Sequence, residues 1–193
     1  MAYYNTTNSR SIPRPDSSAE KFTTQCIYVD SLASNGAVVI PGRTIFNGFT
    51  VTLSKPIILD INTRYVMSLI KAEFDTLLLG NQYNDININT DLIEYQYENG
   101  KQNQILNKIY KVKYNAAFYQ TANPFEYQAI NPINKFIKST TKVISQVSFT
   151  IDRVTASGLI VPLPVNATQI SYPTRICFCI KAVPPNVEST TII

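Results

Sequence analysis

The side chains that most often carry acid–base or nucleophilic chemistry are sparse in this sequence. It contains no histidine, which removes the commonest general base and the imidazole of Ser-His-Asp or Cys-His catalysis. A carboxylate pair remains, because Glu73 and Asp75 stand two residues apart near the end of a predicted strand. Two such carboxylates are ordinarily solvated or ion-paired, so we assign them no role. We expect that the protein has no catalytic residues and is not an enzyme.

Oxygen-bearing side chains with the spacing of the first ligands of a calcium loop occupy four alternate positions: Asp85, Asn87, Asn89 and Asp91. The match to such a loop then ends. Thr90 stands where the sharp turn needs glycine, and Gln96 stands where a bidentate glutamate is expected. Ile86 and Ile88 separate the polar residues, which is the alternation of a strand with one solvated face. We therefore expect a strand here and no metal site.

The three cysteines, Cys26, Cys177 and Cys179, are an odd number in a chain large enough to fold without cross-links. A disulfide framework is therefore not expected, and reduced thiols are the default. Cys177 and Cys179 share one side of a predicted strand, which is half of a thiolate metal site, but no histidine or second pair completes it. We expect buried thiols that pack as small apolar groups. Since no glycine-rich phosphate loop is present either, we expect no cofactor.

The charge balance argues against a polyanionic partner. The formal net charge is +4 and only 16% of the residues are charged. The densest basic stretch holds Lys101, Lys108, Lys111 and Lys113, and Glu94 and Glu98 lie close by in the sequence. Nucleic-acid binding is therefore not expected.

Short β-patterned segments separated by turn residues run through the chain. They are 25–30, 37–40, 46–53, 64–74, 85–97, 109–114, 142–152, 159–161 and 175–183. Apolar residues recur at every second position in most of them, and Asn99-Gly100 is a strong hairpin signal. Residues 115–138, interrupted by Asn123-Pro124 and Asn131-Pro132, indicate a long loop with at most a short helix. About eight strands without a long helix predict an antiparallel two-sheet sandwich or barrel.

A chain of 193 residues fits one domain. Residues 1–22 are polar, contain Pro13 and Pro15, and form an N-terminal arm that is either disordered or tied to a neighbouring subunit. We place the folded domain at 23–185 and a C-terminal tail at 186–193. No signal peptide and no apolar run long enough for a membrane span are visible, so we expect synthesis in the cytosol.

Two regions resemble a known family. Residues 47–59 and 65–74 resemble the opening strands of single jelly-roll minor capsid and penton proteins of Polinton-like viruses, virophages and related large DNA viruses. Residues 147–152 followed by 158–161 are similar to the late strand, turn and strand of those proteins. The turn at 153–157 is longer than in the family, and the middle of the chain has no clear counterpart.

This resemblance implies an all-β single jelly-roll β-sandwich that belongs to a virion. It further implies a homopentamer at fivefold vertices, or a cement protein that contacts the major capsid protein and other minor capsid proteins. An assembly role needs no active site, because a sandwich packs sideways in a closed ring and an arm reaches into its neighbours. The interface residues we expect in the arm are Tyr3, Tyr4, Arg10 and Arg14.

The alternative is a receptor- or glycan-binding jelly roll of a viral fibre or spike. Tyrosine is abundant and suits interfaces. The chain has no tryptophan, however, so a sugar-stacking platform would lack its usual best residue. An enzyme on a cupin-like scaffold would need metal ligands, which a chain without histidine supplies poorly.

Overall fold

The computed structural model of the protein describes residues 24–75, 85–98, 100–110, 124–155, 157–163 and 172–183. In these ranges the regular structure is β-strand, apart from the short 3-10 helix η2 (Ala33–Asn35). The all-β class predicted from the sequence is therefore confirmed. The described segments contain no helix with the length and hydropathy of a membrane span.

The first sheet is antiparallel throughout and has the first and last strands of the chain as neighbours. Its order is β1 (Gln25–Asp30), β13 (Arg175–Val183), β4 (Arg64–Phe74) and β10 (Lys135–Phe136), with β9 (Phe125–Gln128) also paired with β4. β9 pairs with the end of β4 near Phe74, whereas β10 pairs with Val66 and Met67. The two short strands thus occupy one strand position that is interrupted at 129–134.

The second sheet is also antiparallel. Its order is β2 (Ala37–Val39), β3 (Gly48–Ile58), β11 (Val143–Val154), β5 (Asp85–Thr90) and β8 (Ile105–Tyr110), with β12 (Ile160–Pro162) paired with β11. A separate hairpin joins β6 (Gln96–Glu98) to β7 (Lys101–Asn103). Gly100 in its turn has φ +73°, a left-handed conformation that favours glycine and agrees with the predicted Asn99-Gly100 turn.

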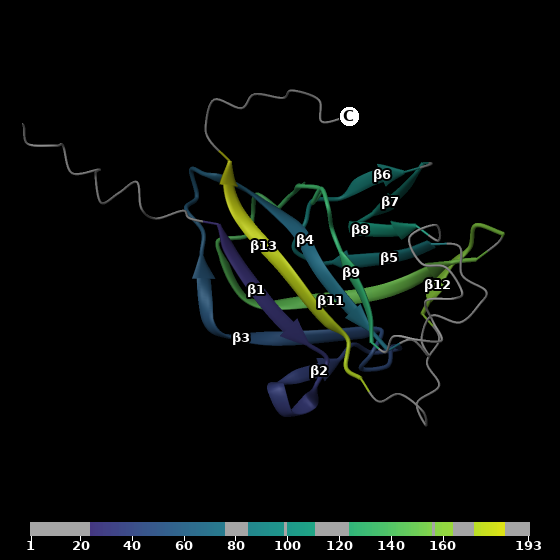
Figure 1. Cartoon of the computed structure of the whole chain (residues 1–193). Coiled ribbons are helices and arrows are strands. Elements are labelled where there is room, and N and C mark those ends of the chain that lie inside the picture. Colours follow the sequence, from purple (N-terminus) through teal and green to yellow (C-terminus); the bar gives the residue numbers. More distant parts are fainter. Residues whose placement is uncertain are drawn as a thin grey trace, which may run out of the picture.

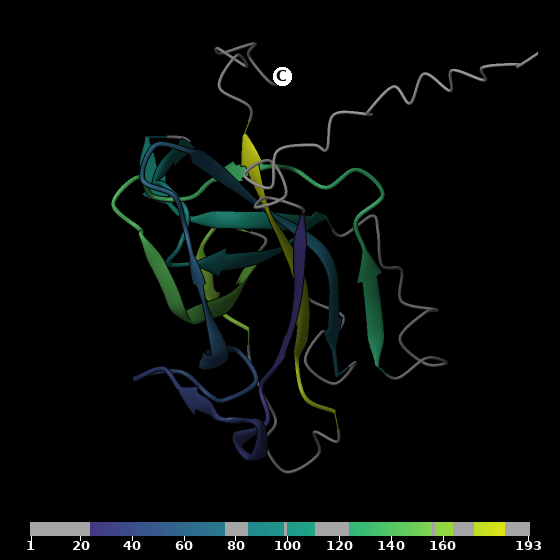
Figure 2. The ribbon, with the colours of Figure 1, turned by 90° about the vertical axis from the view of Figure 1, so that its left-hand side faces the viewer.

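The strand order is that of a jelly roll. If β1, β3, β4, β5, β8, β9–β10, β11 and β13 are counted as strands 1 to 8, one sheet reads 1-8-3-6 and the other 2-7-4-5. This is the double Greek key in which strands leave one sheet and return in the other. Figure 1 shows β1, β13 and β4 side by side in one layer, with β3 and β11 crossing behind them, and Figure 2 again shows β1 next to β13.

One apolar core fills the space between the two sheets. Phe149 of β11 stacks at a tilt against Phe49 of the neighbouring β3, with ring centroids 6.1 Å apart, and against Phe178 of the opposite sheet at 5.6 Å. All three rings are fully buried. Burial of a side chain of this size stabilises the fold by about 1.5–3 kcal/mol. The core therefore connects the sheets through the alternating apolar positions that the sequence predicted.

Several predicted strand positions need correction. Residues 125–128 and 135–136 form strands where we expected a loop, because both pair with β4; residues 111–123 lie outside the described part. The strand predicted at 109–114 begins earlier, at Ile105. β3 continues through Pro56, which lies where the pairing with β11 shifts register, a site that tolerates a residue without an N–H donor.

Candidate functional site

The predicted interface residues Tyr3, Tyr4, Arg10 and Arg14 lie outside the described residues, as does the whole predicted arm at 1–22 and the tail at 186–193. Their roles stay predictions. The described chain starts at residue 24, directly before β1, and β1 is the edge strand of its sheet.

Glu73 and Asp75 do not form a carboxylate pair. Glu73 accepts hydrogen bonds from Lys71 Nζ at 2.7 Å and from Arg175 Nη1 at 3.1 Å, on the outer face of the first sheet. Asp75 is fully buried, and its Oδ2 accepts the backbone N–H of Tyr172 at 3.1 Å. One carboxylate is thus ion-paired, and the other holds the backbone at Tyr172.

The ion-paired cluster perturbs the pKa values of its members. Burial raises the pKa of Glu73, but the hydrogen bonds from Lys71 and Arg175 outweigh burial, and the net pKa lies below the ordinary value. The pKa of Lys71 is raised, first by its hydrogen bond to Glu73 and then by that to Glu126. Both shifts favour the charged forms that the ion pairs require.

Residues 85–90 form the strand β5, as predicted, but the strand ends there because Asp91 lies in a turn. Ile86 and Ile88 point into the core, while Asn89 lies on the outer face and donates from Nδ2 to Asp152 Oδ2 at 2.7 Å. Successive outward side chains on a strand are roughly 7 Å apart, so they do not converge on one ion. In the described residues no cluster of three or more His, Cys, Asp or Glu side chains is arranged to hold a metal.

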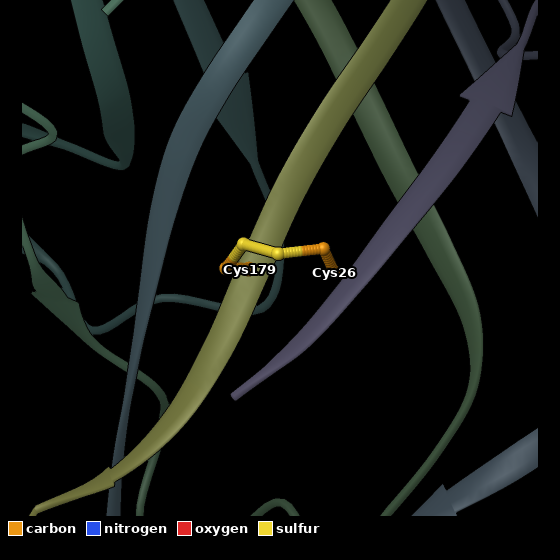
Figure 3. The surroundings of a disulfide bond; sticks show 2 residues. All are labelled: Cys26 and Cys179. Carbon is orange, nitrogen blue, oxygen red and sulfur yellow. A yellow bond between two sulfur atoms is a disulfide. The ribbon is translucent and has the colours of Figure 1, made fainter. Parts of the chain in front are cut away.

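The prediction of reduced thiols is wrong for two of the three cysteines. Cys26 and Cys179 form a disulfide, with S–S 2.01 Å and Cα–Cα 4.1 Å (Figure 3). They are direct register partners in the antiparallel pair β1–β13, so their side chains point to the same face of the sheet. The bond therefore joins the first strand of the jelly roll to the last.

Cys177, the remaining cysteine, is free and buried, as predicted. A hydrogen bond between its thiol and the exposed Tyr28 raises the pKa of the Tyr28 hydroxyl. Because Cys179 is bonded to Cys26, its sulfur is not a thiol. Cys177 and Cys179 therefore do not form the pair of thiolate ligands considered from the sequence.

The lysine stretch is divided by the fold. Lys101 lies in the β6–β7 hairpin and Lys108 lies in β8, whereas Lys111 and Lys113 are outside the described residues. The described part of the stretch therefore belongs to two different sheets.

Sequence reasoning missed a polar network at the start of β3. Arg43 Nη1 lies 2.5 Å from Asp152 Oδ1, and this carboxylate also accepts from Asn89. The side chain of Asp152 is only 10% exposed. A Cβ at Gly48 would lie 2.5 Å from Arg43 Cγ. The aliphatic part of Arg43 therefore occupies space that any side chain at position 48 would fill. The sequence separation of 109 residues between Arg43 and Asp152 left no local signal for this pair.

An open groove of about 630 Å³ runs along the outer face of the second sheet. Its lining includes hydroxyl and amide side chains of β3, β5 and β11, apolar residues of β2, and two residues between strands, Asp91 and Gln104. The lining residues in the strands include Val38, Val39, Thr50, Thr52, Asn89, Gln146, Ser148 and Thr150. Thr50 and Ser148 are hydrogen-bonded at 2.9 Å, and Gln146 donates to Thr52 at 3.1 Å. The lining holds a carboxylate, that of Asp91, and no lysine or arginine.

Large apolar side chains are exposed at several places on the described surface. Ile58, the last residue of β3, is 76% exposed, and its register partner Val143, the first residue of β11, is 53% exposed. Ile130, in the interruption between β9 and β10, is 84% exposed. Ile58 and Val143 are register partners in an antiparallel pair, so their exposed side chains lie on the same face of the second sheet.

The sequence matches no protein-family model and no curated protein. In the comparison with solved structures, the chain is similar to the crystal structure of mavirus penton protein, with 12% sequence identity and a TM-score of 0.38. The similarity covers 53% of this chain and 35% of that chain, so the matched part is about a third of the penton protein's length. The fold assignment given above rests on the strand order of this chain alone.

Proposed function

We propose that this chain is a structural subunit of a viral capsid, either the penton at a vertex or a minor capsid protein against the major capsid protein, and that it is not an enzyme. The observation that supports this most is the jelly-roll strand order, 1-8-3-6 and 2-7-4-5, an arrangement used by viral capsid proteins. Because the same fold also serves lectins, the surface must decide between these functions.

Exposed apolar side chains favour assembly. The patch of Ile58 and Val143 lies where β3 and β11 pair, and Ile130 stands on the interrupted edge beside β4. Surfaces of this kind on different sides of a subunit suit a ring, in which one side of each subunit contacts a different side of the next. A homopentamer in the virion is the arrangement that we infer.

The oligomeric state tests this proposal. The full-length protein should form a closed ring, measured by analytical ultracentrifugation and seen in negative-stain images. Ile58→Asp should shift the protein toward the monomer, because a carboxylate would replace an apolar side chain that the ring buries between subunits. Ser54→Asp, on the exposed part of the same strand, is the matched control and should leave the ring intact. A protein that stays monomeric at every concentration, alone and with its capsid proteins, would refute the proposal.

A second candidate function is supported by the groove on the second sheet. Its size lies in the range of small-ligand sites, and hydroxyl, amide and carboxylate groups suit a neutral sugar. A glycan-binding module predicts saturable binding of a neutral oligosaccharide that Gln146→Ala weakens. The structural subunit predicts no such binding. Titration of the full-length protein with a panel of neutral glycans, followed by amide shifts in NMR spectra, distinguishes the two functions.

A further inference from the structure

The groove on the outer face of the second sheet crosses the strands. Val38 of β2 is the register partner of Thr50 in β3, and Thr50 is in turn the partner of Ser148 in β11. The N–H of Ser148 donates to Asp91 Oδ1 at 3.3 Å, directly after the end of β5. Figure 1 shows these strands in the same order, from β2 at the bottom through β3 and β11 to β5. A row of four lining residues therefore connects the two ends of the groove, Val38 and Asp91.

The two ends of the groove differ in their chemistry. One end is an apolar wall made by Val38 and Val39, both exposed, together with Ile40 and Pro41. At the other end the exposed Asp91 is the charged residue among the lining residues that the structure describes. The ion pairs found between described residues do not include Asp91. A ligand that fills both ends needs an apolar group at one end and a cation at the other.

Between these ends the floor of the groove is polar and uncharged. Thr50 and Ser148 share one hydrogen bond, which leaves one hydroxyl proton of the pair to donate. Gln146 donates from Nε2 to the hydroxyl oxygen of Thr52 at 3.1 Å, which leaves Gln146 Oε1 as an acceptor and the Thr52 proton as a donor. The floor thus offers both donors and acceptors, which the C=O and N–H groups of a peptide backbone require.

The length of the groove selects the spacing of the ligand groups. From Val38 to Asp91 is three strand spacings, or roughly 14 Å. In an extended peptide, side chains four residues apart point to the same side and are also roughly 14 Å apart. An apolar residue and a lysine or arginine with this spacing therefore reach both ends together. A neutral sugar would leave Asp91 without a cation, and the described lining has no aromatic ring for a sugar to stack on.

We propose that the groove binds an extended segment of a partner protein that carries an apolar residue and, four positions away, a lysine or arginine. The apolar side chain packs on Val38 and Val39, the basic side chain pairs with Asp91, and the backbone between them bonds to the hydroxyl and amide floor. This inference assigns a peptide to the groove in place of the neutral sugar considered above. It does not rest on the capsid function.

Titration of the isotope-labelled full-length protein with synthetic peptides tests the proposal. The probe is the acetylated and amidated peptide Leu-Ser-Thr-Ser-Lys, and the comparison peptide is Leu-Ser-Thr-Ser-Gln with the same end groups. The lysine peptide should shift the amide resonances of Val38, Thr50, Ser148 and Asp91 saturably, and it should bind more tightly than the glutamine peptide. Added salt should reduce this preference, because salt screens an exposed ion pair.

Two variants separate the contributions of the two ends. Asp91→Asn removes the charge and keeps the Oδ1 acceptor for Ser148. It should lower the affinity for the lysine peptide roughly two- to fivefold, the effect of one exposed ion pair, and leave that for the glutamine peptide unchanged. Val38→Ser should weaken the binding of both peptides, because it removes apolar contact area.

Asp60→Asn is the matched control for Asp91→Asn. Asp60 is exposed between β3 and β4, outside the groove, and its Oδ1 also accepts a backbone N–H, that of Asn62 at 2.9 Å. The substitution therefore removes the same charge and keeps the same kind of hydrogen bond. It should leave the affinities for both peptides unchanged.

Four results would overturn the proposal. The first is the absence of a saturable shift with either peptide. The second is equal binding of the two peptides, with no effect of Asp91→Asn. The third is binding of a neutral oligosaccharide at the same resonances without binding of peptide, which would assign the groove to a sugar. The fourth is a change in sedimentation caused by Asp91→Asn in the absence of peptide, which would assign the groove to a contact between copies of the chain.

Discussion

The disulfide between Cys26 and Cys179 should make a large contribution to stability, because it connects the two ends of the described domain. Cys26→Ser removes the bond and leaves the fold otherwise intact, since residue 26 is exposed on an edge strand. Loss of the bond frees β1 from covalent attachment to β13, while the backbone pairing of β1 residues 25–30 with β13 remains.

The expected magnitude follows from the length of the loop that the bond closes. The cysteines are separated by 153 residues. A cross-link over a loop of this length removes chain entropy from the unfolded state worth about 5 kcal/mol at 25 °C. Native disulfides typically contribute about 2–5 kcal/mol when they are removed, so Cys26→Ser should lose a free energy of unfolding in this range.

Urea denaturation of four samples measures this effect: wild type and Cys26→Ser, each with and without dithiothreitol. Wild type in reductant should have the stability of Cys26→Ser, and reductant should not change the variant. Cys177→Ala is the control for loss of a buried thiol and should keep its sensitivity to reductant. Equal stability of Cys26→Ser and oxidised wild type would refute the reasoning, as would alkylation of three thiols in the denatured, unreduced protein.

Three further outcomes follow from the described contacts. Gly48→Ala should destabilise the protein by about 1–3 kcal/mol through overpacking against Arg43, and a double-mutant cycle with Arg43→Ala, measured by thermal unfolding, should show positive coupling between the two sites. The pKa of Glu73 is lower in the folded protein than in the unfolded chain, so the ionised carboxylate stabilises the fold. This contribution is complete above about pH 4.5 and is lost as the pH falls through the folded pKa. Urea midpoints measured from about pH 6 to pH 2.5 should therefore fall less steeply for Glu73→Gln than for wild type. Phe149→Ala should cost about 3–5 kcal/mol in the free energy of unfolding, because the ring contacts both sheets, and a loss below 1 kcal/mol would contradict the core as described.

The alternating strands of the two sheets were predictable from local pattern. β4 and β13 begin and end at the residues expected from the sequence, because each has apolar residues at alternate positions facing one core. The hairpin turn at Gly100 was also predictable from local sequence, because glycine readily adopts the left-handed conformation that the turn requires. These features depend on neighbouring residues, which the sequence records directly.

Features that depend on pairing between distant strands were not predictable from local pattern. β9 and β10 are short and flank Pro132, so they carry little signal of their own and form because β4 offers an open edge. The disulfide likewise depends on strands that are far apart in the sequence. The odd number of cysteines argued against a disulfide, whereas the pairing of β1 with β13 brings Cys26 and Cys179 together. In a jelly roll the first and last strands are neighbours, and this rule combined with Cys26 and Cys179 in those strands would have predicted the bond.

Cryo-electron microscopy of the assembled protein would show whether this jelly roll assembles sideways as a capsid building block. We expect a closed ring of jelly-roll subunits in which Ile58 and Val143 of one subunit are covered by the next. A map in which the protein is a single isolated sandwich, with these two side chains in solvent, would contradict it.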